Sequence, residues 1–167
     1  MATRAEAKRG GDLYEEDFAA WVERQVGALR ALAASGAAPP DLDLAHLIEE
    51  VEGLGGSERR GVENRVVVIV GHLLKLEYSP AAEPRRGWHD SVQEQRVQLA
   101  RDLSATLSNH LREVWNNLYP AARDLAADGL QQDGVPATIL PESCPYSFEQ
   151  VTQREWWPRN RHGHDNP

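Results

Sequence analysis

Six polar residues lie on or beside the apolar faces of expected helices, and they are the best candidates for chemistry: Glu50, Glu52, Glu63, His72, Gln95 and Arg96. At 100° per residue, Gln95 and Arg96 fall within the apolar arc of their helix, where leucine would be typical. A buried arginine is not tolerated alone, so Arg96 needs an acidic partner, and the three glutamates are the candidates. The sequence therefore predicts one polar cluster inside a helical bundle.

This cluster has two interpretations. The first is a structural ion-pair network that fixes helix register, since such networks are common without chemistry. The second is a metal or acid–base site in which Glu50, Glu52 and His72 bind a divalent ion. The Glu-x-x-His pattern of di-iron bundles does not occur in the sequence, and 46–50 reads HLIEE where the inverted zinc motif requires H-x-x-E-H. We therefore expect no cofactor, with a divalent metal as the alternative.

Nucleophilic catalysis finds no support in the motifs. The sequence contains no G-x-S-x-G elbow and no glycine-rich phosphate loop. Cys144 lies between Ser143 and Pro145 without a basic neighbour in sequence to lower its pKa, which favours a packing role. Two histidines near the C-terminus, His162 and His164, could chelate a metal only loosely from a flexible tail.

Composition narrows the class of protein. The 167 residues suffice for one domain with its own core, and a single cysteine excludes an internal disulfide framework and suits the cytoplasm. The longest apolar run, 66–70, is too short to span a membrane. The net charge of −8 is uneven: ten acids face two bases in 11–56, and six face eight in 57–101. Such a chain is a poor candidate for binding nucleic acid, which needs a concentrated basic face.

The elements that must position the polar residues are helices. A first helix is predicted from Asp12, as N-cap, to Ser35-Gly36. A second, short helix begins near 41–43 and stops at the glycines of 53–56. A third runs from Ser57 to about 77; its five consecutive β-branched residues would also suit a buried strand, but no second strand exists to pair with it.

The second half continues the helical pattern. A fourth helix is expected over about 88–107 and a fifth from 108 or 109, with a kink or break at Pro120. Ser147 and Gln150 form a capping box for a last short helix, and Trp156-Trp157-Pro158 should dock the C-terminal arm. Residues 1–11 and 159–167 read as disordered, which leaves a single helical domain over 12–158.

Short motifs follow one another in a characteristic order through residues 12–158. They are Tyr14-Glu15-Glu16-Asp17-Phe18 with Trp21, Leu47-Ile48-Glu49-Glu50-Val51-Glu52 with Gly55, His72-Leu73-Leu74-Lys75 with Tyr78 and Pro80, then Trp88, Glu94-Gln95-Arg96, Pro141, Cys144-Pro145-Tyr146 and Trp157-Pro158. In this the chain resembles the bacterial family known as domain of unknown function 29. The resemblance implies an all-helical bundle and supplies no activity, substrate or catalytic residue. Leu76 departs from the pattern, because the family is often aromatic there.

The sequence thus predicts an all-α, mostly antiparallel bundle of four to five main helices with a C-terminal arm. Our leading hypothesis is a non-catalytic interaction protein or small adaptor, homo-oligomeric, that binds itself or another protein through an apolar or tryptophan-bearing face. The alternative is a metal-binding protein or enzyme that uses the Glu/His/Arg cluster. Neither membrane nor nucleic acid is expected as a partner.

Overall fold

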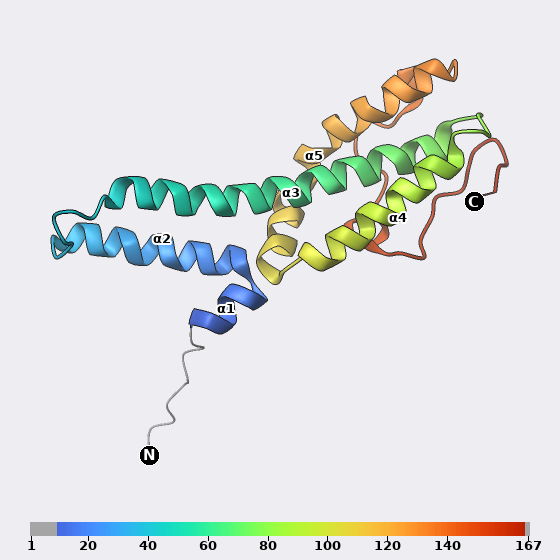
Figure 1. Ribbon diagram of the computed structural model, residues 1–167. Coiled ribbons are helices and arrows are strands. Elements are labelled where there is room, and N and C mark those ends of the chain that lie inside the picture. Colours follow the sequence, from blue (N-terminus) through green and yellow to red (C-terminus); the bar gives the residue numbers. More distant parts are fainter. Residues whose placement is uncertain (1–9, 166–167) are drawn as a thin grey trace. The chain divides into compact units, whose positions relative to one another are not determined.

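The computed structural model describes residues 10–165, and every regular element in that range is a helix (Figure 1). The elements are α1 Gly10–Glu16, α2 Phe18–Ser35, α3 Leu44–Tyr78, α4 Arg85–Asp102, α5 Ala105–Gln132, the 3-10 helix η1 Ala137–Ile139 and α6 Phe148–Thr152. The predicted all-α class is confirmed. Of the N-terminus predicted to be disordered, 1–9 lie outside the described residues, and α1 begins at Gly10, two residues earlier than expected.

The chain divides into two compact units. The first contains the chain up to Arg60 together with Ser104–Asn109, and the second contains Gly61–Leu103 and the chain from His110 onwards. The sequence predicts one domain over 12–158. Two long helices, α3 and α5, each have residues in both units. Their apolar stripes continue along the sequence without a break, which is why the sequence predicts a single core.

The first unit begins with a helix break that the sequence did not predict. Asp17, with φ of −152°, separates α1 from α2 and caps α2 by accepting a hydrogen bond from Ala20 N at 3.0 Å. The predicted N-cap, Asp12, lies inside α1 instead. The predicted end at Ser35-Gly36 is confirmed, because Gly36 adopts the left-handed conformation that terminates helices.

Helix α3 runs without interruption over 35 residues, so the two helices predicted on either side of a glycine hinge are in fact one. Gly55 does not end the helix, and its packing against α2 explains why this position is glycine. A Cβ on Gly55 would lie 2.9 Å from Val22 Cγ1, so the missing side chain lets α2 and α3 pack closely. Gly53, by contrast, would meet no atom within 4 Å.

The second unit has a conventional apolar core. Most of the fully buried side chains come from α3, α4 and α5, with Val151 from α6, and they include Ile69, Leu73, Leu74, Val92, Leu99, Leu111 and Leu130. A Cβ on Gly71 would lie 2.3 Å from Leu125 Cδ2, so α3 and α5 also approach closely. Pro120 lies inside α5 without ending it; because Pro120 is exposed, water can satisfy the carbonyl that it leaves free.

The boundary between α4 and α5 differs from the prediction by several residues. Helix α4 ends at Asp102 and α5 begins at Ala105, not at 108 or 109. The Oγ of Ser104 accepts a hydrogen bond from Leu107 N at 3.2 Å, which makes Ser104 the effective N-cap. The capping box of Ser147 and Gln150 at the start of α6 is confirmed.

Substitutions at two glycines of α3 test the close approach of α2 and α3. We expect Gly55→Ala to lower the free energy of unfolding by about 1–3 kcal/mol, because the new methyl group overlaps the stiff Val22 side chain. Gly53→Ala should instead raise it by about 0.5–1 kcal/mol, because alanine favours the helix and meets no neighbour. Urea denaturation followed by circular dichroism measures both. Equal effects of the two substitutions would contradict the packing role of Gly55.

Candidate functional site

The residues of the predicted polar cluster are divided between the two units. Glu50 and Glu52 belong to the first unit, whereas Glu63, His72, Gln95 and Arg96 belong to the second. The four residues of the second unit each contact different neighbours.

Arg96 is held by backbone carbonyls and not by an acid. Its side chain is only 1% exposed, and it donates from Nε to Val151 O at 2.8 Å. It also donates to Gln150 O at 3.0 Å and to Arg154 O at 3.3 Å. The guanidinium carbon lies 4.8 Å from the ring centroid of Trp157. Burial lowers its pKa to about 10, so Arg96 stays protonated at neutral pH.

The acidic partner predicted for Arg96 is therefore wrong: within residues 10–165 its hydrogen bonds go to carbonyl oxygens. Three carbonyls at the end of a short helix and just beyond it can satisfy a buried cation, because each carries unused lone pairs. Such acceptors occur at every residue, so the sequence cannot mark them.

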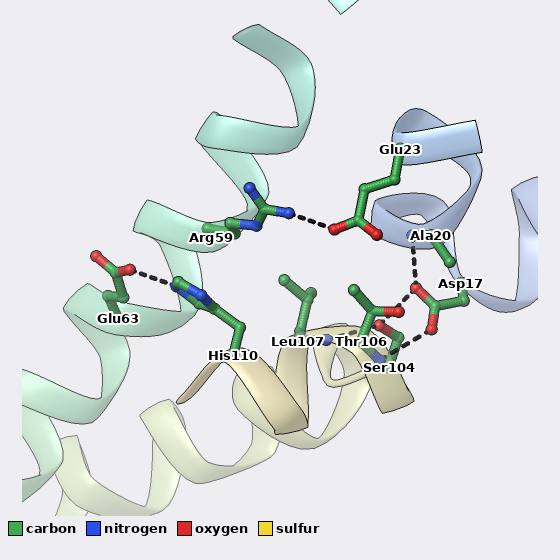
Figure 2. Close-up of polar contacts among 9 residues, drawn as sticks. All are labelled: Asp17, Ala20, Glu23, Arg59, Glu63, Ser104, Thr106, Leu107 and His110. Atoms are coloured by element: carbon green, nitrogen blue, oxygen red, sulfur yellow. Dashed lines mark hydrogen bonds and ion pairs between the residues drawn. The ribbon is translucent and has the colours of Figure 1, made fainter. Parts of the chain in front are cut away.

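The predicted glutamates and Gln95 have other partners. In the first unit Glu52 pairs with Arg30 at the surface, and Glu50 is exposed. In the second unit Glu63 Oε1 lies 2.6 Å from His110 Nε2 (Figure 2). Gln95 Oε1 accepts from Arg65 Nη1 at 3.3 Å, and Arg65 also pairs with Asp102 at 3.0 Å.

His72 is partly buried, and its Nδ1 has no hydrogen-bond partner among the described residues. Burial, reinforced by the nearby charge of Lys75, lowers the pKa of His72 to about 4. Nowhere in residues 10–165 do three His, Cys, Asp or Glu side chains gather as metal ligands. Of the residues named for the alternative metal site, Glu50 and Glu52 lie in the first unit and His72 in the second.

The C-terminal segment contains polar contacts that the sequence did not predict. The sequence predicts a disordered tail over 159–167, and the structure shows specific bonds from residues 160–164 to the end of α3 and the residues just after it. Asn160 Nδ2 donates to Leu76 O at 2.8 Å and to Ser79 O at 2.9 Å. His162 and His164 contact the carbonyls of Tyr78 and Pro80 through Nε2, at 3.1 and 2.8 Å. The carbonyls of Leu76 and Tyr78 belong to the last turn of α3, which leaves them without intrahelical partners, and Ser79 and Pro80 follow directly after it.

Glu77 links this segment to the core of the second unit. The hydroxyl of Tyr146 donates to Glu77 Oε2 at 2.7 Å, and Arg161 Nε donates to Oε1 at 3.1 Å. Burial, and then the charge of Glu77, raises the pKa of Tyr146, which therefore stays neutral. Nearby, Trp157 stacks on His89 and Trp156 packs edge-on against Tyr146, so the predicted docking of the arm is confirmed.

The second unit also encloses a small apolar cavity lined in part by Cys144, Trp115 and Tyr119. Its volume of about 10 Å³ is close to that of a single water-sized sphere, too small for an organic substrate. Burial raises the pKa of the Cys144 thiol, an effect that a backbone hydrogen bond from Tyr146 only partly opposes. The thiol is therefore poorly suited to act as a nucleophile.

In the first unit, Asp17 joins the chain start to Ser104–Asn109. Its carboxylate accepts from Ser104 Oγ at 2.9 Å and from Thr106 N at 3.0 Å, in addition to Ala20 N (Figure 2). Partial burial opposes ionisation of Asp17, but these hydrogen bonds outweigh it and lower its pKa. Asp17 is thus a structural clamp between two segments that lie far apart in sequence.

Two surface features of the first unit remain without a structural role. One is a groove of about 350 Å³ between α2 and α3, lined by Val22, Glu23, Val26, Gly27, Arg30, Glu52, Gly55 and Arg59. The other consists of exposed large apolar residues on α3, Leu47 and Leu54, which are 40% and 51% exposed. Their spacing of seven residues is typical of a buried apolar stripe, but the structure leaves both side chains exposed.

Comparison with known proteins identifies the family. The family described as domain of unknown function DUF29 matches residues 13–157. The chain belongs to this family. A crystal structure of an alpha-helical protein of unknown function from Rhodospirillum rubrum is also similar, with a TM-score of 0.73 and 26% sequence identity. That match covers 86% of this DUF29 chain and 90% of the other.

Two further comparisons are negative. No curated protein matches this DUF29 chain. In the described part of the chain, no helix combines the length and the apolar character that crossing a membrane requires.

The depressed pKa of His72 predicts a defined pH dependence of stability. The unfolded chain binds a proton at His72 near the ordinary pKa of 6.5, whereas the folded chain does not until about pH 4. This contribution is therefore fully present above pH 6.5 and is lost as the pH falls towards 4, at most about 3 kcal/mol. We expect urea unfolding of His72→Gln to lose less stability than wild type between pH 7 and pH 4.5. Parallel losses in the two proteins would contradict the assignment.

Proposed function

We propose that this chain is a non-catalytic adaptor whose first unit binds an amphipathic helix of a partner protein. The observation that carries the proposal is the pair of exposed leucines on α3, Leu47 and Leu54, seven residues apart. Val51 lies between them on the same side and is half-buried. Together they form a row, here named the leucine row, that spans two helical turns.

The leucine row differs from ordinary scattered apolar exposure. A single exposed leucine needs no explanation, but apolar residues at helical spacing on one side of a helix are what a second helix binds. The packing of α3 on α2 centres on Gly55, which contacts Val22 and lies about 80–100° around the helix from the two leucines, so these flank the contact and stay exposed. The row is thus available in the isolated chain.

Charge narrows the class of partner. Glu50 lies three residues after Leu47, and Glu58 lies four residues after Leu54, so both flank the row. Residues 11–56 contain ten acids against two bases, which makes the surroundings acidic as well. A second copy would bring like charges together, whereas a helix with Lys or Arg beside its apolar face would be attracted.

The contacts that the polar candidate residues make in the structure support a non-catalytic role. In the second unit Arg96 is occupied by carbonyls, Glu63 by His110 and Gln95 by Arg65. Side chains that already hold the fold together are not free to bind substrate or to move protons. These arrangements favour the interaction hypothesis over an enzyme that uses the polar cluster.

A synthetic helical peptide with leucines at heptad spacing and flanking lysines is a suitable probe. Fluorescence anisotropy should report saturable binding of this peptide to the full chain, weakened by salt. The double substitution Leu47→Ser with Leu54→Ser should weaken binding at least about tenfold, equivalent to about 1.4 kcal/mol. Ile139→Ser is the matched control, because Ile139 is 42% exposed in the second unit, and it should leave binding unchanged.

Three results would contradict the proposal. Equal binding of a peptide of the same composition in scrambled order would indicate only attraction between charges. Equal loss on Ile139→Ser would indicate a non-specific apolar effect. Absence of binding to any of these peptides would remove the adaptor function as formulated.

A further inference from the structure

We infer that the groove between α2 and α3 is a self-association surface that pairs with the same surface of a second copy of this chain. The surface, here named the groove face, comprises Val22, Val26, Gly27 and Gly55 as its floor, with two ion pairs across it. This inference goes beyond the adaptor function, because it concerns another side of α3 and another partner.

The ion pairs of the groove face form a regular pattern. At one end Glu23 of α2 pairs with Arg59 of α3 at 2.5 Å. At the other end the signs are exchanged, and Arg30 of α2 pairs with Glu52 of α3. The four side chains remain 37% to 62% exposed, so a partner can reach them.

The sequence repeats the same spacing on both helices. Helix α2 carries Val22-Glu23, then Gly27 and Arg30, and α3 carries Val51-Glu52, then Gly56 and Arg59. Both read V-E-x-x-x-G-x-x-R. Because the two helices are antiparallel, this repeat places an acid and a base at each end of the groove face and exchanges their sides from one end to the other.

This alternating arrangement of four charges is complementary to a second copy of itself. If a second groove face is laid over the first by a two-fold axis in the plane of contact, every acid lies over a base. This holds whether the axis runs along the helices or across them. Isologous dimers require this property of one surface that meets its own copy. An anion or a nucleic acid is not favoured here, since each arginine is already matched by a glutamate.

The floor of the groove face allows another helix to approach. A Cβ on Gly27 would meet no atom within 4 Å, so nothing inside the first unit requires glycine there. Glycine within a helix costs about 0.5–1 kcal/mol relative to alanine. Close packing of a second copy against Gly27 would explain why glycine is present there despite this cost. The charged residues would then fix how the two copies align.

The groove face and the leucine row can operate together. Glu52 and Leu54 are two positions apart on α3, hence about 200° apart around the helix axis. A dimer joined through the groove face would therefore leave both leucine rows outward and accessible. Pairing through the leucine row itself would bring Glu50 and Glu58 against the acids of the second copy.

Charge exchange tests the inference on the full chain by sedimentation velocity at low salt. We expect the wild-type mass to approach twice 18.6 kDa as concentration rises. An all-acid variant, Arg30→Glu with Arg59→Glu, and an all-base variant, Glu23→Arg with Glu52→Arg, should each remain monomeric. Mixed in equal amounts, they should form a heterodimer, because every acid again meets a base.

A variant that preserves both ion pairs distinguishes loss of dimerisation from loss of folding. Gly27→Leu should keep the helical circular dichroism of wild type, since nothing lies near that position, and should remain monomeric because its side chain blocks the approach. A monomeric wild type at all concentrations, an all-acid variant that dimerises like wild type, or a mixture that stays monomeric would each overturn the inference. Dimerisation lost only with Leu47→Ser and Leu54→Ser would overturn it in favour of the leucine row. Peptide binding by a monomeric wild type would leave the adaptor function intact.

Discussion

The second unit depends on the buried guanidinium of Arg96 and on the carbonyl oxygens that receive its hydrogen bonds. The segment after α5 has little regular structure of its own: one 3-10 turn and one helix of five residues. Such a segment cannot fold alone, because a short helix does not recover the entropy that ordering costs. Arg96 fixes α6, and Glu77 and Asn160 then fasten the following residues to the end of α3. The C-terminal arm is thus an integral part of the unit.

This arrangement shifts the search for function away from the polar residues. Arg96, Glu63 and Gln95 make contacts that hold the fold together, and the apolar cavity beside Cys144 has room for about one water molecule. What lacks an internal purpose lies on the first unit: exposed leucines in a row and a groove with a self-complementary charge pattern. An adaptor that dimerises through one side and binds a helix through another accounts for both features.

Sequence reasoning recovered the helical class, the end of α2 at Gly36 and the capping box of α6, because these follow from local periodicity and local hydrogen bonds. It failed at Gly55 and Asp17, where a distant segment decides the outcome: Val22 requires the glycine, and Ser104 and Thr106 occupy the carboxylate. The candidate site failed for a related reason. An arginine within the apolar arc of a helix predicts that the side chain is buried, but it does not predict which groups accept its hydrogen bonds. Every residue has a backbone carbonyl, so the sequence does not show which carbonyls these are.

The most direct test of this account is the free energy of unfolding of Arg96→Leu, measured in urea at neutral pH beside Arg101→Leu, an exposed position on the same helix. We predict a loss of about 3 kcal/mol or more for Arg96→Leu, because three carbonyls lose their donor and the C-terminal arm loses its anchor. Arg101→Leu should stay within about 0.5 kcal/mol of wild type. Unchanged or increased stability of Arg96→Leu would contradict the central role given to this cation.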